Sequence, residues 1–200
     1  MPPAPGGINA PGGMPLDPFM TRWDAAIDGT GGIVLLHLDW ETQPWRMLLG
    51  RFRPDGAVDS VFASTYSPDR FSDETRPKPN AGSPFGPGVA VDDVGRIIVA
   101  GCSESGMTVW RFNPDGSPDT GFGQAGAVAR NNGVSGYDDY GTSVAIDSDG
   151  RVLVTGATYL NDDRHVMAIW CLTPDGEFDT AFGENGRIVA SGSTGSHGNG

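Results

Sequence analysis

Short runs of apolar residues alternate with polar, turn-forming segments along most of the chain. Runs of this length between turn residues predict β-strands. Residues 107–112 alternate with a period of two, because Thr108, Trp110 and Phe112 fall on one side of a strand and the residues between them on the other. In the last third of the chain we expect four strands, at about residues 143–147, 151–156, 167–172 and 186–191. The second of these is nearly continuous in Val, Leu and Thr, which predicts burial on both of its faces.

Two motifs recur three times in the same order. The first reads AAIDGTGGIVLLH at 25–37, VAVDDVGRIIVAG at 89–101 and VAIDSDGRVLVTG at 144–156. The second reads RFRPDGAVDSVF at 51–62, RFNPDGSPDTGF at 111–122 and CLTPDGEFDTAF at 171–182, so its Pro, Gly, Asp and Phe recur every 60 residues. Pro-Asp-Gly favours a tight turn, since Pro fixes φ at one position and Gly accepts a positive φ at another. These motifs predict three similar units of four strands each.

The strings VAIDSDGRVLVTG and RFNPDGSPDTGFGQAGAV resemble the bacterial delta-60 repeat, and the resemblance covers roughly residues 22–191. It implies propeller-like blades of four strands, and it implies no particular activity. The first unit departs from the pattern at Ala63, which replaces the Gly of the Phe-Gly pair, and at Gly50, which stands where the other units have Trp. We therefore expect an all-β fold of three four-stranded antiparallel blade-like repeats of propeller type, with β-trefoil-like closure as the alternative.

The organisation expected from these patterns has three parts. A Pro/Gly-rich N-terminal arm spans 1–21, the β domain spans 22–191, and a flexible Gly/Ser tail spans 192–200; the units cover about 22–64, 85–130 and 141–191. Propellers usually have 4–8 blades, so three units leave strand edges that are open to pairing. Two chains joined in a six-bladed ring, an arc capped by other subunits, and trefoil-like closure all remain open. We expect protein partners, as a homo-oligomer or a multi-subunit assembly.

Composition excludes several classes of partner. The 31 Gly and 16 Pro disfavour a helical protein. The net charge of −12 disfavours a nucleic-acid surface and attraction to anionic membranes. Apolar runs are far shorter than the ~18 residues of a membrane-spanning helix, and the N-terminus resembles no secretory signal. Localisation stays open; a virion, or an extracellular position reached without a signal peptide, is compatible with these features. Cys102 and Cys171 are expected to be reduced structural thiols.

Catalytic and metal motifs are not found in the sequence. NPDGSPD at 113–119 resembles half of a calcium loop, but Arg111 stands at the first ligand position and Pro114 interrupts the loop, which favours a plain turn. The three histidines have no zinc-site spacing, and no nucleophile elbow is present. We expect no catalytic residue, no metal and no cofactor, and therefore no enzyme.

Aromatic, acidic and amide side chains gather in the loops that interrupt the repeat. Loops mounted on rigid sheets often carry function, and aromatic residues beside carboxylates suit a sugar or a protein partner. The candidate ligand or partner contacts are Trp40, Trp45, Tyr137, Asp138, Asp139, Tyr140, Tyr159, Asp162 and Asp163.

The first functional hypothesis is a non-enzymatic structural or interaction module, a subunit of a larger assembly such as a virion or a cell-surface particle. It predicts a large apolar or strand-edge interface. A propeller module that binds a glycan or a protein ligand is the second hypothesis, and it predicts a concave pocket where the loop tyrosines converge. A hydrolase that uses paired carboxylates such as Asp92 and Asp93 is the third.

Overall fold

The structure, a computed structural model, describes residues 22–39, 46–63, 87–103, 105–131, 139–159 and 165–190. These residues form three antiparallel sheets in which strands follow one another in chain order. Sheet 1 contains β1 (Arg22–Ile27), β2 (Ile33–Asp39) and β3 (Arg46–Phe52), followed by the short helix α1 (Ser60–Ala63). Sheet 2 contains β4 (Gly88–Val91), β5 (Ile97–Ser103), β6 (Gly106–Phe112) and β7 (Ala127–Arg130). Sheet 3 contains β8 (Tyr140–Ile146), β9 (Val152–Tyr159), β10 (His165–Leu172) and β11 (Arg187–Val189).

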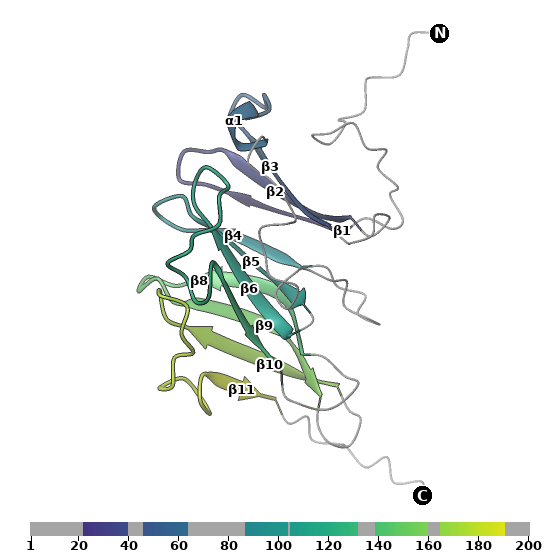
Figure 1. The fold of residues 1–200 in the computed structure, drawn as a ribbon, viewed down its shortest axis with the longest axis vertical. Coiled ribbons are helices and arrows are strands. Elements are labelled where there is room, and N and C mark those ends of the chain that lie inside the picture. The colour runs from purple at the N-terminus through teal and green to yellow at the C-terminus, as the bar shows by residue number, and fades with distance from the viewer. Residues whose placement is uncertain are drawn as a thin grey trace, which may run out of the picture.

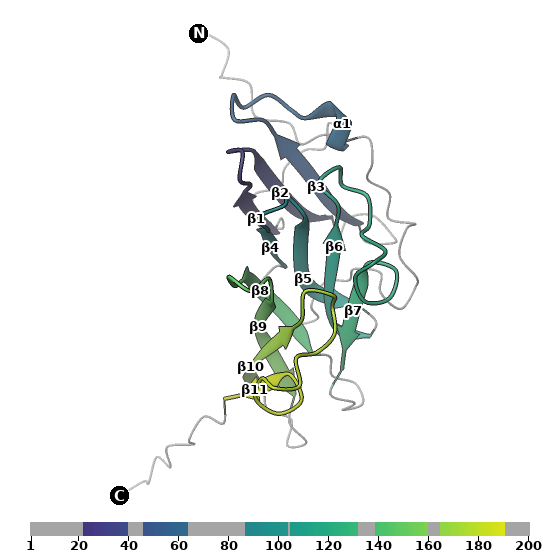
Figure 2. The same ribbon diagram turned by 90° about the vertical axis from the view of Figure 1, so that its left-hand side faces the viewer.

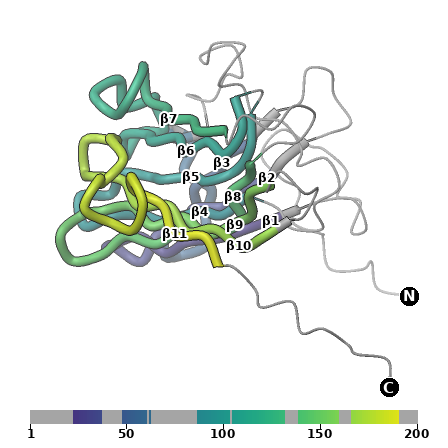
Figure 3. The backbone as a smooth tube through the Cα atoms, turned by 90° about the horizontal axis from the view of Figure 1, so that it is seen from below, coloured from purple at the N-terminus to yellow at the C-terminus, as the bar shows by residue number. Residues whose placement is uncertain are grey.

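The three sheets are stacked in chain order. Figure 1 shows sheet 1 at one end, sheet 3 at the other and sheet 2 between them, and Figure 2 shows the same order from the side. Seen along the stack in Figure 3, the sheets overlie one another. Their first strands, β1, β4 and β8, lie side by side. The predicted all-β class is confirmed, and this stacking is propeller-like.

The core lies in the two interfaces between neighbouring sheets. One contains Val34, Leu36 and Leu49 of sheet 1 against Val89, Ile97, Val99, Trp110 and Phe112 of sheet 2. The other contains Ile98, Ala100, Met107 and Val109 of sheet 2 against Val152, Val154, Ala168, Trp170 and Leu172 of sheet 3. Successive residues of β5 thus face opposite neighbours, which explains why every residue of β5 and β6 is buried.

Burial on both faces was predicted for residues 151–156, and there the prediction is wrong. Within β9, Val152 and Val154 are buried, whereas Leu153 is half-buried and Thr155 is exposed. The reason is position in the stack, because sheet 3 has a neighbouring sheet on one side and sheet 2 has one on both.

The three Pro-Asp-Gly turns share one backbone geometry. The amides of Gly56, Gly116 and Gly176 donate to the carbonyls of Arg53, Asn113 and Thr173 at 2.8, 2.8 and 2.9 Å. The three glycines have φ values of 80°, 84° and 90°, in the left-handed region that favours glycine. Turn chemistry read from the sequence is therefore realised in each sheet.

Four strands per unit are found in sheets 2 and 3, whereas the described part of the first unit has three. In the first unit the described residues end with α1 at Ala63. In sheet 2 the corresponding residue, Gly123, has a φ of 52°, and a Cβ there would collide with the Val128 side chain and the Ala127 carbonyl. The geometry of Gly123 therefore does not accept an alanine without a shift of its neighbours. α1 has four residues, and no helix within the described residues is long and apolar enough to cross a membrane.

Candidate interaction site

Each sheet has two distinct faces, which we name by their neighbours. The front face of a sheet points toward the next sheet along the chain, and the back face points toward the preceding one. Sheet 2 uses both: its front face, with Ile98, Met107 and Val109, is covered by the back face of sheet 3. Both junctions that the structure describes are front-to-back.

No sheet within the described residues covers the front face of sheet 3. Ala168 and Trp170 point back into the core, so Met167 and Ile169 point to the front, where Ile169 pairs with Ile188. Met167 occupies the position that Met107 has in sheet 2, yet Met167 is 55% exposed and Met107 is 0% exposed. Ile188 is 43% exposed. An apolar face of the type that is buried at the front of sheet 2 is therefore open at the front of sheet 3.

The back face of sheet 1 is exposed at Ile27 and Ile33, although His37 on the same face is buried. Ile27 pairs with Ile33, and Ile33 pairs with Phe52 on the next strand. Ile27 is 73% exposed and Ile33 is 40% exposed. The corresponding residues of sheet 2 are the paired Val91, Ile97 and Phe112, which pack in the core against sheet 1.

One large aromatic position differs on this back face. In sheet 2, Trp110 packs over Gly101, where a Cβ would lie 3.2 Å from the indole. In sheet 1 the large and the small residue have changed places: Gly50 corresponds to Trp110, and His37 corresponds to Gly101. The His37 ring instead stacks on Trp23 of β1, with 4.2 Å between ring centroids and an interplanar angle of 10°. At this position the aromatic side chains of sheet 1 therefore come from β1 and β2, whereas Trp110 of sheet 2 comes from its third strand, β6.

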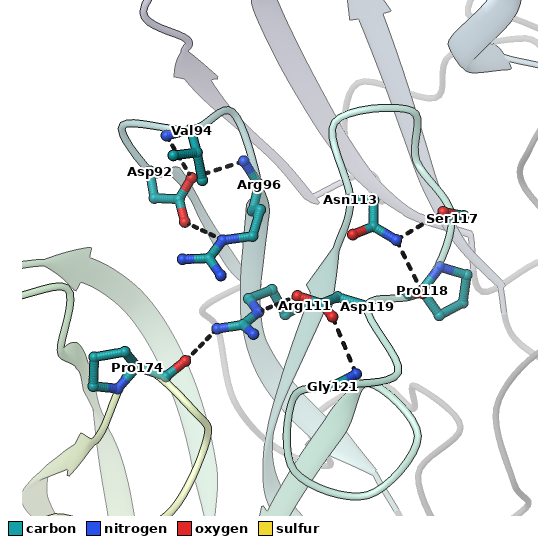
Figure 4. A network of polar contacts seen from close by, with 10 residues as sticks. All are labelled: Asp92, Val94, Arg96, Arg111, Asn113, Ser117, Pro118, Asp119, Gly121 and Pro174. Atoms are coloured by element: carbon teal, nitrogen blue, oxygen red, sulfur yellow. Dashed lines mark hydrogen bonds and ion pairs between the residues drawn. The ribbon is translucent and has the colours of Figure 1, made fainter.

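An arginine links each sheet to the next. The Arg51 guanidinium donates to the Pro114 carbonyl at 3.1 Å, and Arg111 donates to the Pro174 carbonyl in the same way. Figure 4 shows Arg111 between Pro174 and Asp119, to which it is paired at 2.8 Å. Its guanidinium also lies 4.4 Å from the centre of the Phe122 ring. Each link thus runs from the third strand of a sheet to the Pro-Asp-Gly turn of its neighbour.

Sheet 3 has a cysteine at this position. Cys171 is the counterpart of Arg51 and Arg111, and it is buried, as is Cys102. Burial raises the pKa of the Cys171 thiol, which keeps it neutral. In sheet 3, Arg151, just before β9, pairs with Asp147 at 2.8 Å and with Asp179 at 3.3 Å. The front face of sheet 3 therefore has no guanidinium at position 171 to offer a neighbouring turn.

The first turn of sheet 1 holds a strongly bound carboxylate. Asp28 accepts hydrogen bonds from the Thr30 hydroxyl, the Thr30 amide and the Gly32 amide, and pairs with Arg51 at 2.6 Å. Burial by itself raises the pKa of Asp28, but these hydrogen bonds and the arginine charge outweigh it and lower the pKa to about 2. Asp28 thereby holds Arg51 in place for its link to sheet 2.

A polar cleft of about 320 Å³ lies between the turn that joins β4 to β5 and the turn that joins β8 to β9. Asp92, Asp93, Asp147 and Asp149 line it together with Arg96. Asp92 accepts from the Arg96 side chain and from two amides of its own turn, so it serves the turn itself (Figure 4). Within the described residues, no three His, Cys, Asp or Glu side chains are grouped so that they could hold a metal ion. The cleft can offer carboxylates to hydroxyl or cationic groups.

Three of the loop residues predicted as contacts are described. Asp139 is buried, and its carboxylate accepts from the Thr158 hydroxyl at 2.6 Å. Tyr140 is buried at the start of β8 and pairs with Ala157, two residues before the half-buried Tyr159, so both tyrosines lie at one end of sheet 3. The other six lie outside the described residues: Trp40, Trp45, Tyr137, Asp138, Asp162 and Asp163. For all nine, ligand contact stays a prediction.

Sequence reasoning missed the open strand faces. Met167, Ile188, Ile27 and Ile33 lie in strands, whereas the residues predicted as contacts were chosen from the loops. The signal that could have found them is the repeat itself, since stacked units have two faces each and the first and last of the three described sheets have a described neighbour on one face.

Models of two propeller families match parts of the chain. The Domain of unknown function (DUF5122) beta-propeller matches residues 95–122 and 148–182, and the Beta-propeller repeat matches residues 129–162. The chain is a propeller-like β-repeat protein.

Two further comparisons add little to this propeller-like assignment. Among curated proteins, none matches the chain. A solved structure, a fucose lectin from Kordia zhangzhouensis in complex with methyl-fucoside, is 11% identical to it, with a TM-score of 0.40 over 85% of this chain and 98% of that chain. This likeness is too distant to say what the propeller-like chain binds.

Proposed function

We propose that the chain is a non-enzymatic structural module of three delta-60-like blades, which joins protein subunits into a larger assembly such as a virion or a cell-surface particle. One observation carries the proposal: the front face of sheet 3 is apolar and uncovered, whereas the same face of sheet 2 is buried against a neighbouring sheet. Association is the way in which such a face becomes covered.

The free energy gained by covering this face can be estimated one side chain at a time. Full burial of a large apolar side chain contributes roughly 1.5–3 kcal/mol. Met167 and Ile188 are about half exposed, so each would contribute roughly 1 kcal/mol on association. The half-buried Leu153 and Ile169 lie on the same face and would add to this. A contact of this kind is reversible and depends on protein concentration.

The test is the molar mass of the chain by light scattering across the micromolar range. We expect the wild-type chain to associate and the double variant Met167→Glu/Ile188→Glu to stay monomeric, because charges on the face cannot be buried without a partner. Val94→Glu is the matched control, since Val94 is 67% exposed but lies at a turn, away from the sheet faces. Circular dichroism and melting curves establish that all three chains are folded.

A monomeric wild-type chain throughout that range would refute the proposal. Association of the double variant to the same extent as the wild type would refute it as well.

A ligand-binding module is the second candidate, favoured by the cleft between the two turns. Its volume of about 320 Å³ is within the range of small-molecule sites. Binding of immobilised glycans by the wild-type chain, and its loss in Asp93→Asn/Asp149→Asn, would support this candidate; no binding to any glycan of the panel would remove it.

A further inference from the structure

The two open faces of the chain are of opposite kinds. Sheet 3 leaves a front face open and sheet 1 leaves a back face open, and both described junctions join a front face to a back face. Ile27, Ile33 and Phe52 on the open back face take the positions of Val91, Ile97 and Phe112, which pack against the front face of sheet 1. The chain therefore displays both halves of the contact that it builds twice internally.

One chain cannot join these halves to each other. Sheet 2 lies between sheet 1 and sheet 3, and the two open faces point away from it at opposite ends of the stack (Figures 1 and 2). A second copy of the chain can present the missing back face.

We infer that the front face of sheet 3 binds the back face of sheet 1 of a second copy, and that two copies close head-to-tail into a ring of six sheets. The inference rests on the proposed function and names its partner. Propellers close with 4–8 blades, and with the three sheets that the described residues of each chain form, two copies give a total of six, in that range. A head-to-tail contact of this kind closes into a ring when its rotation is right.

The joint between copies differs from the internal junctions at one residue. Within the chain, Arg51 contacts the Pro114 carbonyl and Arg111 contacts the Pro174 carbonyl. If the joint between copies repeats this geometry, position 171 of one copy faces the Pro54 carbonyl of the other. Because position 171 is a cysteine, this joint is made without the arginine link. We therefore expect the two copies to separate more readily than neighbouring sheets within a chain.

Cys171→Arg would restore the arrangement of sheet 2. There the residue corresponding to Arg151, Arg96, pairs with Asp92, while Arg111 takes the carboxylate of Asp119. In sheet 3, Asp179 pairs with Arg151 at 3.3 Å and also lies 4.0 Å from the Cys171 sulfur, so an arginine at position 171 would share this carboxylate with Arg151.

The decisive experiment mixes two variants, one altered on each face. Met167→Glu/Ile188→Glu alters the front face and Ile27→Lys/Ile33→Lys alters the back face, both at exposed positions. We expect each variant alone to be monomeric. Mixed in equal amounts they should form a heterodimer of twice 20.9 kDa, because one joint then unites two unaltered faces and the other unites opposite charges. Native mass spectrometry identifies the mixed species.

The outcomes separate this inference from the proposed function. If the front-face variant is monomeric but the back-face variant still associates, sheet 3 binds another sheet 3; the head-to-tail inference fails and the proposed function stands. If the wild type itself is monomeric, both fail. If neither variant alone associates and the mixture does not either, the inference is overturned.

Cys171→Arg supplies an independent measurement. A hydrogen bond from a charged donor at both joints is expected to lower the dissociation constant of the dimer roughly tenfold or more. A folded Cys171→Arg chain that dissociates like the wild type would show that position 171 does not face the turn of a second copy.

Discussion

Gly176 lies in the turn of sheet 3 that packs against sheet 2. Its φ is 90°, and a Cβ added there would lie 2.8 Å from the Gly123 nitrogen and 2.8 Å from the ring of the buried Phe122. Next to it, the Gly123 amide donates to the Asp175 carbonyl at 3.0 Å. Gly56 holds the same position in the turn of sheet 1, with a φ of 80° and nothing within 4 Å of an added Cβ. Alanine at these two positions therefore separates the cost of the turn from the cost of the contact between sheets.

The magnitudes follow from this difference. A residue with a Cβ pays roughly 1–2 kcal/mol in the left-handed region, and that is the whole loss of stability expected for Gly56→Ala. Gly176→Ala adds an overpacked contact with backbone and a buried ring, which costs roughly 1–3 kcal/mol more. For a chain of this length 1 kcal/mol corresponds to roughly 2–4 °C in Tm. Gly176→Ala should therefore melt roughly 4–8 °C below Gly56→Ala, if the extra cost is about 2 kcal/mol.

Thermal and urea unfolding measure this difference, with tryptophan fluorescence as a probe because Trp110 and Trp170 are buried in the two interfaces. Each variant is compared with the wild-type chain at a concentration where all are monomeric. Equal shifts for both variants would refute the reasoning, because they would mean that the turn of sheet 3 does not touch sheet 2.

Three more predictions follow from the polar contacts. Asp28→Asn should reduce the free energy of unfolding by roughly 1–2 kcal/mol at neutral pH. Because the pKa of Asp28 is about 2 against an ordinary 3.8, this contribution is complete above pH 3.8 and fades as the pH falls toward 2; a difference between variant and wild type that is independent of pH would contradict it. Arg111→Met should lower the free energy of unfolding by roughly 3 kcal/mol, since a buried ion pair and the link to sheet 3 are lost. Arg53→Met, which removes an exposed ion pair, should change it by about 0.5 kcal/mol or less. Urea titrations measure both, and equal effects would argue against the link. Cys102 and Cys171 should react with thiol reagents only as fast as the chain opens, and prompt labelling of the native protein would contradict their burial.

The strands and tight turns could be predicted from the sequence because each depends on residues that are neighbours along the chain. Strands expected at 151–156 and 167–172 are found as β9 (Val152–Tyr159) and β10 (His165–Leu172). The expected tight turns lie before β9, where the Gly150 amide donates to the Asp147 carbonyl, and after β10, where the Gly176 amide donates to the Thr173 carbonyl. The errors lie at the far ends of these strands, which run two or three residues further than expected. There no Pro or Gly marks the end of the strand, so the pattern alone cannot place it.

What a face meets could not be predicted, since it depends on the order of sheets in the stack. Ile98 and Leu153 occupy the same position in their units, yet Ile98 is buried and Leu153 is half-buried. Period two divides a strand into two faces without telling which face has a neighbour. For the same reason, the predicted contacts fell on the aromatic and acidic loops. Loop residues of these types can be recognised from the sequence, whereas an exposed strand face can be recognised only from its surroundings in the fold.

The front-to-back stacking of the sheets also governs how the molecule comes apart. Sheet 2 is held from both sides and the outer two sheets from one, so the stability of the chain is shared unevenly, as in a short linear array of repeats. Fluctuations that detach sheet 1 or sheet 3 leave the rest intact, and the amides of β5 and β6 should be the last to exchange with solvent.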